Sequence, residues 1–174
     1  DEDNEEDDSA SGEIKNTDFV LDKSGTLSGG IAKWEIIIND LQNWKRTDLP
    51  ESTKTITDTL PEYMAYVDGS AKCMLYKENE EKNPEETAIT ASFDSSTRKL
   101  TMTVPALTGK VRAVITYDTK ITTLPTGSGN GVTVDGDRIS FTNSVTVGKK
   151  TESATVTMTS KELHKVGKAV SGLK

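Results

Sequence analysis

The stretch Arg138-Ile-Ser-Phe-Thr-Asn-Ser-Val-Thr-Val147 decides the fold class, because its side chains alternate between polar and apolar at every position except Asn143. Successive side chains of a β-strand point to opposite faces of the sheet. One row is therefore predicted to be buried, since it carries Ile, Phe and two Val residues, and the other row, of Ser and Thr residues, is predicted to face solvent. The middle member of the apolar row is Asn143, a carboxamide.

The same period of two persists from Thr17 to about Thr159, rich in Thr and Val and interrupted by turn residues. It predicts nine strands: Phe19–Lys23, Ala32–Asn39, Lys54–Leu60, Ala71–Tyr76, Ile89–Phe93, Leu100–Val104, Val111–Thr122, Arg138–Val147 and Ser153–Thr159. We expect an all-β sandwich over residues 17–160 and no long helix.

The two ends of the chain are predicted to lie outside this sandwich. Residues 1–16 are acidic and contain a Ser- and Gly-rich joint, which is typical of a disordered tail. Residues 161–174 are interpreted as a linker or as the start of a following, similar domain, because Leu163–Gly167 weakly echoes Leu21–Gly25. An ordinary basic tail explains the same residues.

Negative charge is concentrated at the N-terminal end. The 174 residues carry 21 Lys and Arg against 28 Asp and Glu, a net charge of −7, and seven of the acids lie between Asp1 and Asp8. The rest of the chain is neutral, which argues against a basic nucleic-acid-binding surface. No apolar run approaches the ~20 residues that cross a bilayer, and no signal peptide is visible. We expect any export or anchoring signal to lie outside this segment.

One cysteine, Cys73, and one histidine, His164, restrict the available chemistry. A disulfide within the chain is impossible, and a Cys/His zinc site needs more ligands. A Ser-His-Asp or Cys-His enzyme would have to use His164, which lies in a Lys-rich stretch. We therefore expect no conventional enzyme, no cofactor and no metal. Cys73 is expected to be a buried, inert thiol. Asp135–Asp137 and the acidic loop Lys77–Glu86 lack the EF-hand spacing for calcium.

Three of the predicted inward rows each contain one polar side chain. The row of the first strand reaches Lys23, Asp58 stands between Ile56 and Leu60 in the third strand, and Asn143 is the third case. Burying one unpaired charge costs several kcal/mol. Three unrelated accidents of this kind are hard to accommodate in a core built from 33% hydrophobic residues. We therefore predict that the three side chains meet.

Their meeting in a dry pocket would change their chemistry. Burial lowers the pKa of Lys23 towards a neutral, nucleophilic amine and raises the pKa of Asp58 towards a neutral acid. The amine can then attack the carbonyl carbon of Asn143 while Asp58 polarises the carbonyl oxygen, stabilises the tetrahedral intermediate and moves protons to the leaving ammonia. The product is an isopeptide bond, formed once per chain without turnover. Trp34 or Phe141 is expected to pack there and to exclude water.

Two simpler arrangements remain open from the residues alone. Lys23 and Asp58 can form a plain buried ion pair capped by Asn143. Lys23 can also extend its ammonium to solvent from a strand end.

Several stretches stand in an order that resembles a known family: Leu21-Asp-Lys-Ser-Gly25, Ala32-Lys-Trp-Glu-Ile-Ile-Ile-Asn39, Ile56-Thr-Asp-Thr-Leu-Pro-Glu62, Tyr66-Val-Asp-Gly69, Leu100-Thr-Met-Thr-Val-Pro105, Ile115-Thr-Tyr-Asp-Thr-Lys-Ile121 and Phe141-Thr-Asn-Ser144. Together they cover most of residues 19–147. They resemble the isopeptide-forming, immunoglobulin-like domains of Gram-positive surface adhesins and pilins, most closely the CnaA-type second domain of collagen-binding-type adhesins.

The resemblance implies an immunoglobulin-like β-sandwich of the CnaA or DEv-IgG type. In that family a first-strand lysine is joined to an asparagine near the end of the domain, and an aspartate from the strand before a Leu-Pro turn is the catalyst. By position these are Lys23, Asn143 and Asp58, the same three residues that alternation selects. Nothing in the chain matches a ligand-binding trench, so collagen binding is not carried over.

The resulting hypothesis is a stalk or adhesin module of an extracellular, cell-wall-anchored protein, monomeric, whose partners are the neighbouring domains of its own polypeptide. An alternative hypothesis is an adhesin domain that recognises a host protein or glycan through a sheet face or through the loop Lys77–Glu86, with Trp44 as a candidate contact. A third is a non-covalent spacer in an extracellular enzyme.

Overall fold

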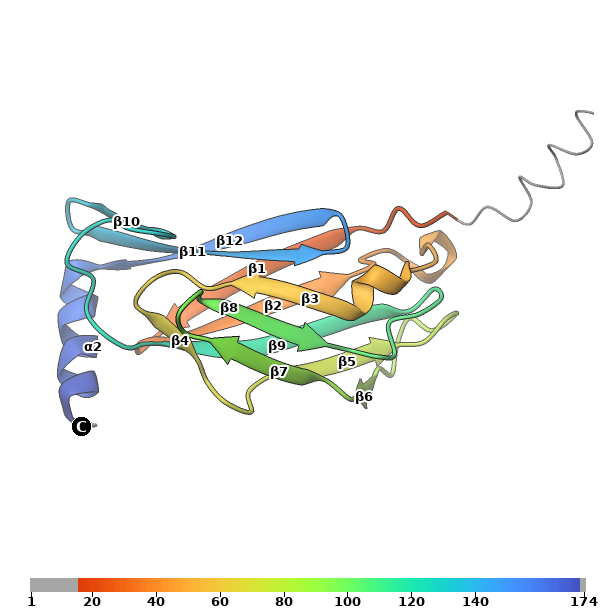
Figure 1. Cartoon of the computed structure of the whole chain (residues 1–174), viewed down its shortest axis with the longest axis horizontal. Helices are drawn as coiled ribbons and strands as arrows, with labels where there is room; N and C mark the ends of the chain where they lie inside the picture. The colour runs from red at the N-terminus through yellow and green to blue at the C-terminus, as the bar shows by residue number, and fades with distance from the viewer. Residues whose placement is uncertain (1–15, 173–174) are drawn as a thin grey trace, which may run out of the picture.

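Two antiparallel sheets pack face to face, with one helix across an end of the sandwich (Figure 1). The computed structural model describes residues 16–172. The predicted acidic tail therefore lies, except for its last residue, outside the described residues. The predicted all-β sandwich is confirmed.

The first sheet has six strands. Its order is β1 (Leu21–Ser28), β2 (Ile31–Ile38), β9 (Arg112–Ile121), β5 (Lys72–Tyr76) and β6 (Glu85–Thr87), and β4 (Met64–Tyr66) also pairs with β9. The β1–β2 hairpin closes through Gly29 and Gly30, whose φ angles are 60° and 85°. A two-residue turn with positive φ at both positions suits the twist of a hairpin and favours glycine.

The second sheet also has six strands. Its order is β10 (Val132–Asp135), β11 (Arg138–Val147), β3 (Thr55–Thr59), β8 (Lys99–Thr103) and β7 (Thr90–Asp94), and β12 (Lys150–Thr159) pairs with β11. Two short 3-10 helices, η1 (Asn43–Lys45) and η2 (Glu51–Lys54), lie in the connection between β2 and β3.

All nine predicted strands are present, with ends displaced by a few residues. Three strands were not predicted: β4, β6 and β10. Each has only three or four residues, too few for an alternating pattern to stand out from a loop.

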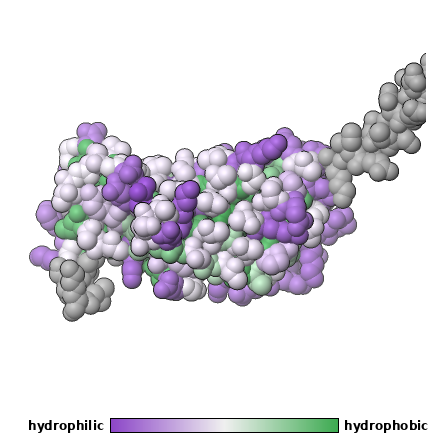
Figure 2. All heavy atoms as spheres, viewed as in Figure 1, coloured by the Kyte–Doolittle hydropathy of each residue, from purple (hydrophilic) through white to green (hydrophobic). Residues whose placement is uncertain are grey.

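The predicted inward and outward rows correspond to buried and exposed faces. On β11 the inward row from Ile139 to Val147 is at most 3% exposed. Its outward Ser and Thr side chains pair with those of β12 through hydrogen bonds of 2.8 to 3.0 Å: Ser140–Thr157, Thr142–Thr155 and Thr146–Thr151. Hydrophilic residues lie across the face seen in Figure 2, where hydrophobic ones show only in small patches. The inner rows of the two sheets therefore form the core.

The C-terminal segment corrects the expectation of no long helix, because α2 (Ser160–Gly172) follows β12 directly. The Thr159 hydroxyl accepts the Glu162 backbone N–H and donates to the Glu162 carboxylate, a helix start close to a capping box. Leu163 and Val166 are buried against the sandwich. Val166 packs over Gly30, where an added Cβ would lie 2.9 Å from its Cγ1. Residues 163–167 are thus helical, whereas residues 21–25, which they weakly echo, form a strand.

Candidate functional site

Lys23 reaches the interior from the edge strand β1. Its backbone pairs with Ile36 of β2, so its side chain lies on the same face as the core residues of that strand. The side chain is fully buried. Its Nζ lies 2.9 Å from Asp58 Oδ2 and 2.5 Å from the hydroxyl oxygen of Tyr117. Lys23 therefore does not extend to solvent, which excludes one of the simpler arrangements considered above.

Asp58 and Asn143 face Lys23 from the opposite sheet. Asp58 is in β3 and pairs across the sheet with Val145 of β11, two residues beyond Asn143. Both side chains belong to residues that are 0% exposed. Asn143 Nδ2 donates a 3.0 Å hydrogen bond to the hydroxyl of Tyr117. The structure thus brings the three predicted residues together across the sandwich.

The sequence reasoning missed Tyr117, on which the three meet. It lies in β9, is 1% exposed, and donates from its hydroxyl to Asp58 Oδ2 at 2.5 Å while accepting from Lys23 and Asn143. The alternation of Ile115–Ile121 places Tyr117 on the inward row, so the signal was present. The pattern did not distinguish Tyr117, because a tyrosine is common in a protein core, whereas a lysine is not.

Trp34 forms one wall around the amine. Lys23 Nζ lies 5.3 Å from the Trp34 ring centroid and 5.0 Å from that of Tyr117. The indole N–H donates to Thr119 Oγ1 at 2.8 Å, which fixes the ring. Gly25 pairs with Trp34 across the hairpin, and a Cβ on Gly25 would overlap the ring. Gly25 is a second residue that the sequence analysis did not select, and its role is to admit the indole.

Phe141, the other predicted wall residue, is 0% exposed and precedes Asn143 by one step on the inward row of β11. Phe141, Trp34 and Tyr117 are three large buried rings on the inward faces of β11, β2 and β9. Such a setting removes water and strengthens every electrostatic interaction inside it.

Burial sets the protonation of the site. It lowers the pKa of the Lys23 amine, against the attraction of Asp58. It raises the pKa of the Asp58 carboxyl, against the attraction of Lys23 and the hydrogen bond from Tyr117. It also raises the pKa of Tyr117 well above its ordinary value, and the nearby Asp58 charge acts in the same direction. Each shift favours the neutral form of its group.

Two buried oxygens of the site have no hydrogen-bond partner: Asp58 Oδ1 and Asn143 Oδ1. A buried acceptor without a donor costs about 1 to 3 kcal/mol. A proton on Asp58 Oδ1 would turn one of these acceptors into a donor. The neutral acid is therefore favoured by the hydrogen-bond inventory as well as by burial.

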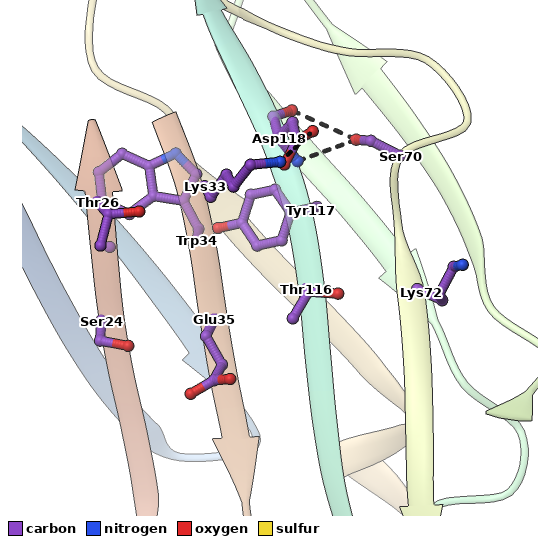
Figure 3. A pocket seen from close by; sticks show the side chains of 11 residues that line it. Ser24, Thr26, Lys33, Trp34, Glu35, Ser70, Lys72, Thr116, Tyr117 and Asp118 are labelled. Atoms are coloured by element: carbon purple, nitrogen blue, oxygen red, sulfur yellow. Dashed lines mark hydrogen bonds and ion pairs between the residues drawn. The ribbon is translucent and has the colours of Figure 1, made fainter. Parts of the chain in front are cut away.

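A concavity of about 630 Å³ lies on the outer face of the first sheet (Figure 3). Its rim residues follow the outward rows of β1, β2 and β9, where Ser24 aligns with Glu35 and Thr116, and Thr26 aligns with Lys33 and Asp118. Lys33 and Asp118 form an ion pair of 3.4 Å. The lining therefore combines the aromatic side chains of Trp34 and Tyr117 with polar groups of both charge signs.

The loop Lys77–Glu86 is held by a buried arginine. Arg46, whose side chain is fully buried, donates to the carbonyl oxygens of Leu41, Lys77 and Glu80 and pairs with the Glu81 carboxylate. Beside it, Trp44 is 69% exposed on η1. Arg46 thus gives the acidic loop a defined position next to an exposed aromatic ring.

Cys73 is confirmed as a buried thiol, and burial raises its pKa to about 12. A thiol with so high a pKa carries little thiolate and reacts slowly. Within residues 16–172 no three His, Cys, Asp or Glu side chains gather as a metal site would require. No helix in that part of the chain is long and apolar enough to span a membrane.

Comparison with known proteins shows the fold. No protein-family model and no curated protein matches the chain. Among solved structures, the collagen-binding subdomain of the Enterococcus faecalis surface protein ACE matches with a TM-score of 0.50 and 12% identity, over 81% of this chain and 99% of that one. A longer structure of ACE, described as binding its ligands by the collagen Hug model, matches with a TM-score of 0.50 and 10% identity, over 82% of this chain and 51% of that one. The collagen-binding domain of a Staphylococcus aureus adhesin matches with a TM-score of 0.48 and 13% identity, over 81% of this chain and 99% of that one. At these identities the two ACE structures show a shared β-sandwich fold.

Proposed function

We propose that this chain is a stalk module of a Gram-positive cell-surface adhesin or pilin, secured by an intramolecular isopeptide bond between Lys23 and Asn143 with Asp58 as catalyst. One observation carries the proposal. An amine, a carboxyl and a carboxamide from three strands of two sheets converge on one hydroxyl in a fully buried site. The shared fold with domains of the surface protein ACE supports the cellular setting.

The buried groups favour condensation over a stable ion pair. Burial shifts both Lys23 and Asp58 towards their neutral forms, and a neutral amine has the free electron pair that attack requires. Protonated Asp58 can donate to the Asn143 carbonyl oxygen, which satisfies the two unpartnered acceptors at once. The same hydrogen bond would draw electron density away from the carbonyl carbon and stabilise the oxyanion.

The reaction balances without any added reagent. The Nζ electron pair of Lys23 forms a bond to the Asn143 carbonyl carbon, and the bond from that carbon to Nδ2 then breaks. One proton is lost from Nζ, one is gained by Nδ2, and ammonia leaves. Asp58 begins and ends protonated, so it acts as a catalyst, and the product amide cannot react again.

The bond would tie an early strand of one sheet to a late strand of the other. By analogy with a disulfide, closing a loop from residue 23 to residue 143 stabilises the fold by about 5 kcal/mol through the unfolded chain. An amide bond is indifferent to reduction, which suits an extracellular domain with a single cysteine. The module would therefore resist unfolding and mechanical load.

Intact-mass spectrometry tests the proposal. The purified chain should be lighter than its sequence by one ammonia molecule, and tandem spectra should join a peptide containing Lys23 to one containing Asn143. Asp58→Ala should have the full mass. Asp94→Ala, which removes an exposed carboxylate at the end of β7, should still lose ammonia. A full mass for the unaltered chain would refute the crosslink and leave a non-covalent spacer.

A second function, recognition of a host protein or glycan, is favoured by the concavity on the first sheet. Its lysines and carboxylates offer hydrogen bonds and charge to a polar ligand. Immobilised matrix proteins and glycans provide the test. Lys33→Glu should abolish binding above background, while Lys150→Glu, on β12 of the other sheet, should leave it intact. Equal binding by both variants, or none by the unaltered chain, would remove this candidate.

A further inference from the structure

The Tyr117 hydroxyl oxygen contacts both nitrogens of the proposed reaction. It accepts from the Lys23 amine at 2.5 Å and from Asn143 Nδ2 at 3.0 Å, and it donates to Asp58 Oδ2 at 2.5 Å. The nitrogen that would form a bond and the nitrogen that would leave are thus joined through a single oxygen. An oxygen in this position can exchange protons with both.

We propose that Tyr117 is a catalytic residue of the crosslinking reaction, and that its hydroxyl carries a proton from the attacking Lys23 nitrogen to the departing Asn143 nitrogen. This inference rests on the crosslink proposed above. The proposal assigns different roles to Asp58 and Tyr117. Asp58 activates the carbonyl oxygen and holds the Tyr117 hydroxyl, and Tyr117 moves the proton that lets ammonia leave.

The proton transfer follows from the change at the carbonyl carbon. In the carboxamide, the Nδ2 electron pair is delocalised into the carbonyl group, so Nδ2 can only donate to Tyr117. Once Lys23 has added and the carbon is tetrahedral, that electron pair is localised on Nδ2, which can then accept. The Tyr117 O–H turns from Asp58 towards Nδ2 and protonates it, while the oxygen takes one proton from the positively charged Nζ. Tyr117 ends as it began, and Nδ2 departs as ammonia with the electrons of its bond to carbon.

The surroundings of Tyr117 suit a relay. The residue is 1% exposed in the middle of β9, with Trp34 beside it across the sheet. No bulk water competes for the proton in such an interior. Burial also keeps the phenol in its neutral form, which both accepts and donates, as a phenolate or an aspartate carboxylate alone cannot.

The test follows crosslinking of the full chain from the moment it is made. The chain is produced by cell-free translation, samples are quenched in acid at intervals, and intact mass gives the fraction that has lost ammonia. Tyr117→Phe is expected to slow the loss at least about 100-fold, the usual effect of removing a proton-transfer group. Tyr66→Phe is the matched control, because it also removes a buried tyrosine hydroxyl from the first sheet. That hydroxyl accepts a hydrogen bond from the Ala71 N–H at 3.0 Å. Tyr66→Phe should crosslink at the rate of the unaltered chain.

The outcomes separate the two proposals. A full mass for the unaltered chain refutes the crosslink itself. Loss of ammonia at equal rates from the unaltered chain and from Tyr117→Phe overturns the role of Tyr117 alone.

Far-ultraviolet circular dichroism of uncrosslinked Tyr117→Phe should match that of Asp58→Asn, which would show that both fold alike. If Tyr117→Phe fails to fold, trifluorotyrosine incorporated at position 117 keeps the ring and hydroxyl while making the oxygen a weaker base. Because the same oxygen gives a proton to Nδ2 and takes one from Nζ, the more acidic hydroxyl should change the rate of ammonia loss, and an unchanged rate would overturn the assignment.

Discussion

The proposed crosslink should account for a large share of the stability of the domain, and Asp58→Asn measures that share. Asparagine keeps the volume of the side chain but cannot supply the acidic proton, so Lys23 and Asn143 should remain separate. The unfolded chain then regains the freedom of a loop from residue 23 to residue 143, worth about 5 kcal/mol. For a domain of this length that corresponds to a fall in the thermal midpoint of about 10 to 20 °C.

Guanidinium chloride unfolding of Asp58→Asn and of the unaltered chain provides the assay. The crosslinked unfolded chain is more compact, so the dependence of the unfolding free energy on denaturant concentration should be steeper for Asp58→Asn. Both changes are needed, because a lower midpoint with an unchanged slope would indicate only damaged packing. Equal midpoints for the unaltered chain that has lost ammonia and for Asp58→Asn that has not would refute the loop-closure reasoning.

The pH dependence of the unfolding free energy in two uncrosslinked variants separates the effect of burying Lys23 from the effect of burying Asp58. In Asp58→Asn, Lys23 has a folded-state pKa below its ordinary value of 10.5. The unfolded state then binds the extra proton, so stability should rise with pH up to about that value. In Lys23→Met, Asp58 has a folded-state pKa above 3.8. The folded state binds the extra proton, so stability should fall as pH rises from 3.8. Slopes of the same sign in the two variants would contradict the assigned pKa directions.

Three further substitutions probe a wall of the buried site, the loop Lys77–Glu86 and an outward carboxylate of β1. Gly25→Ala should displace the Trp34 ring, lower the unfolding free energy by about 1 to 3 kcal/mol and slow ammonia loss, and an unchanged rate in the mass assay would show that the ring is not needed. Arg46→Lys replaces a fork of donors by one ammonium; hydrogen exchange at residues 77–81 should rise at least tenfold, and unaltered protection would show that the arginine does not hold this loop. Asp22, whose pKa is raised to about 6 by a hydrogen bond with Asp40 and by burial, contributes stability below pH 3.8 that is lost as pH rises through 6. The difference between the thermal midpoint of Asp22→Asn and that of the unaltered chain should therefore shift in favour of Asp22→Asn as pH rises from 4 to 7. A difference that stays constant over this range would show that Asp22 does not bind a proton with a raised pKa.

The face on which each polar residue lies could be predicted from the sequence, because alternation along a strand fixes which side chains share a face. Lys23, Asp58 and Asn143 each occupy a row whose other members are apolar, and the structure buries all three. Alternation says nothing about which row lies opposite which. The prediction that the three residues meet rested on the energetic cost of burying each of them without a partner. This argument needs no knowledge of the topology.

The residues that escaped prediction are those whose local pattern looks ordinary. Tyr117 continues an apolar row and gains its importance from three partners distant in sequence. Gly25 is unremarkable until Trp34 is placed opposite it. The helix α2 did carry a local signal, the Thr159–Glu162 cap followed by Leu163 and Val166. Residues 161–174 were instead interpreted as a linker or as the start of a following domain, because Leu163–Gly167 weakly echoes Leu21–Gly25.

The proposed bond also determines how the domain would bear tension. The described chain enters at one end of the sandwich, before β1, and leaves at the other end through α2, so a pull on the two ends runs along the strands (Figure 1). With Lys23 joined to Asn143, that pull bypasses residues 24–142 and passes from β11 to β12. These strands share ten paired positions, from Arg138 with Thr159 to Val147 with Lys150. Because the load is parallel to the strands, their hydrogen bonds resist it together rather than one at a time. Among the residues of α2 whose burial is described, only Leu163 and Val166 are buried, so α2 should detach under force well before any strand of the sandwich separates.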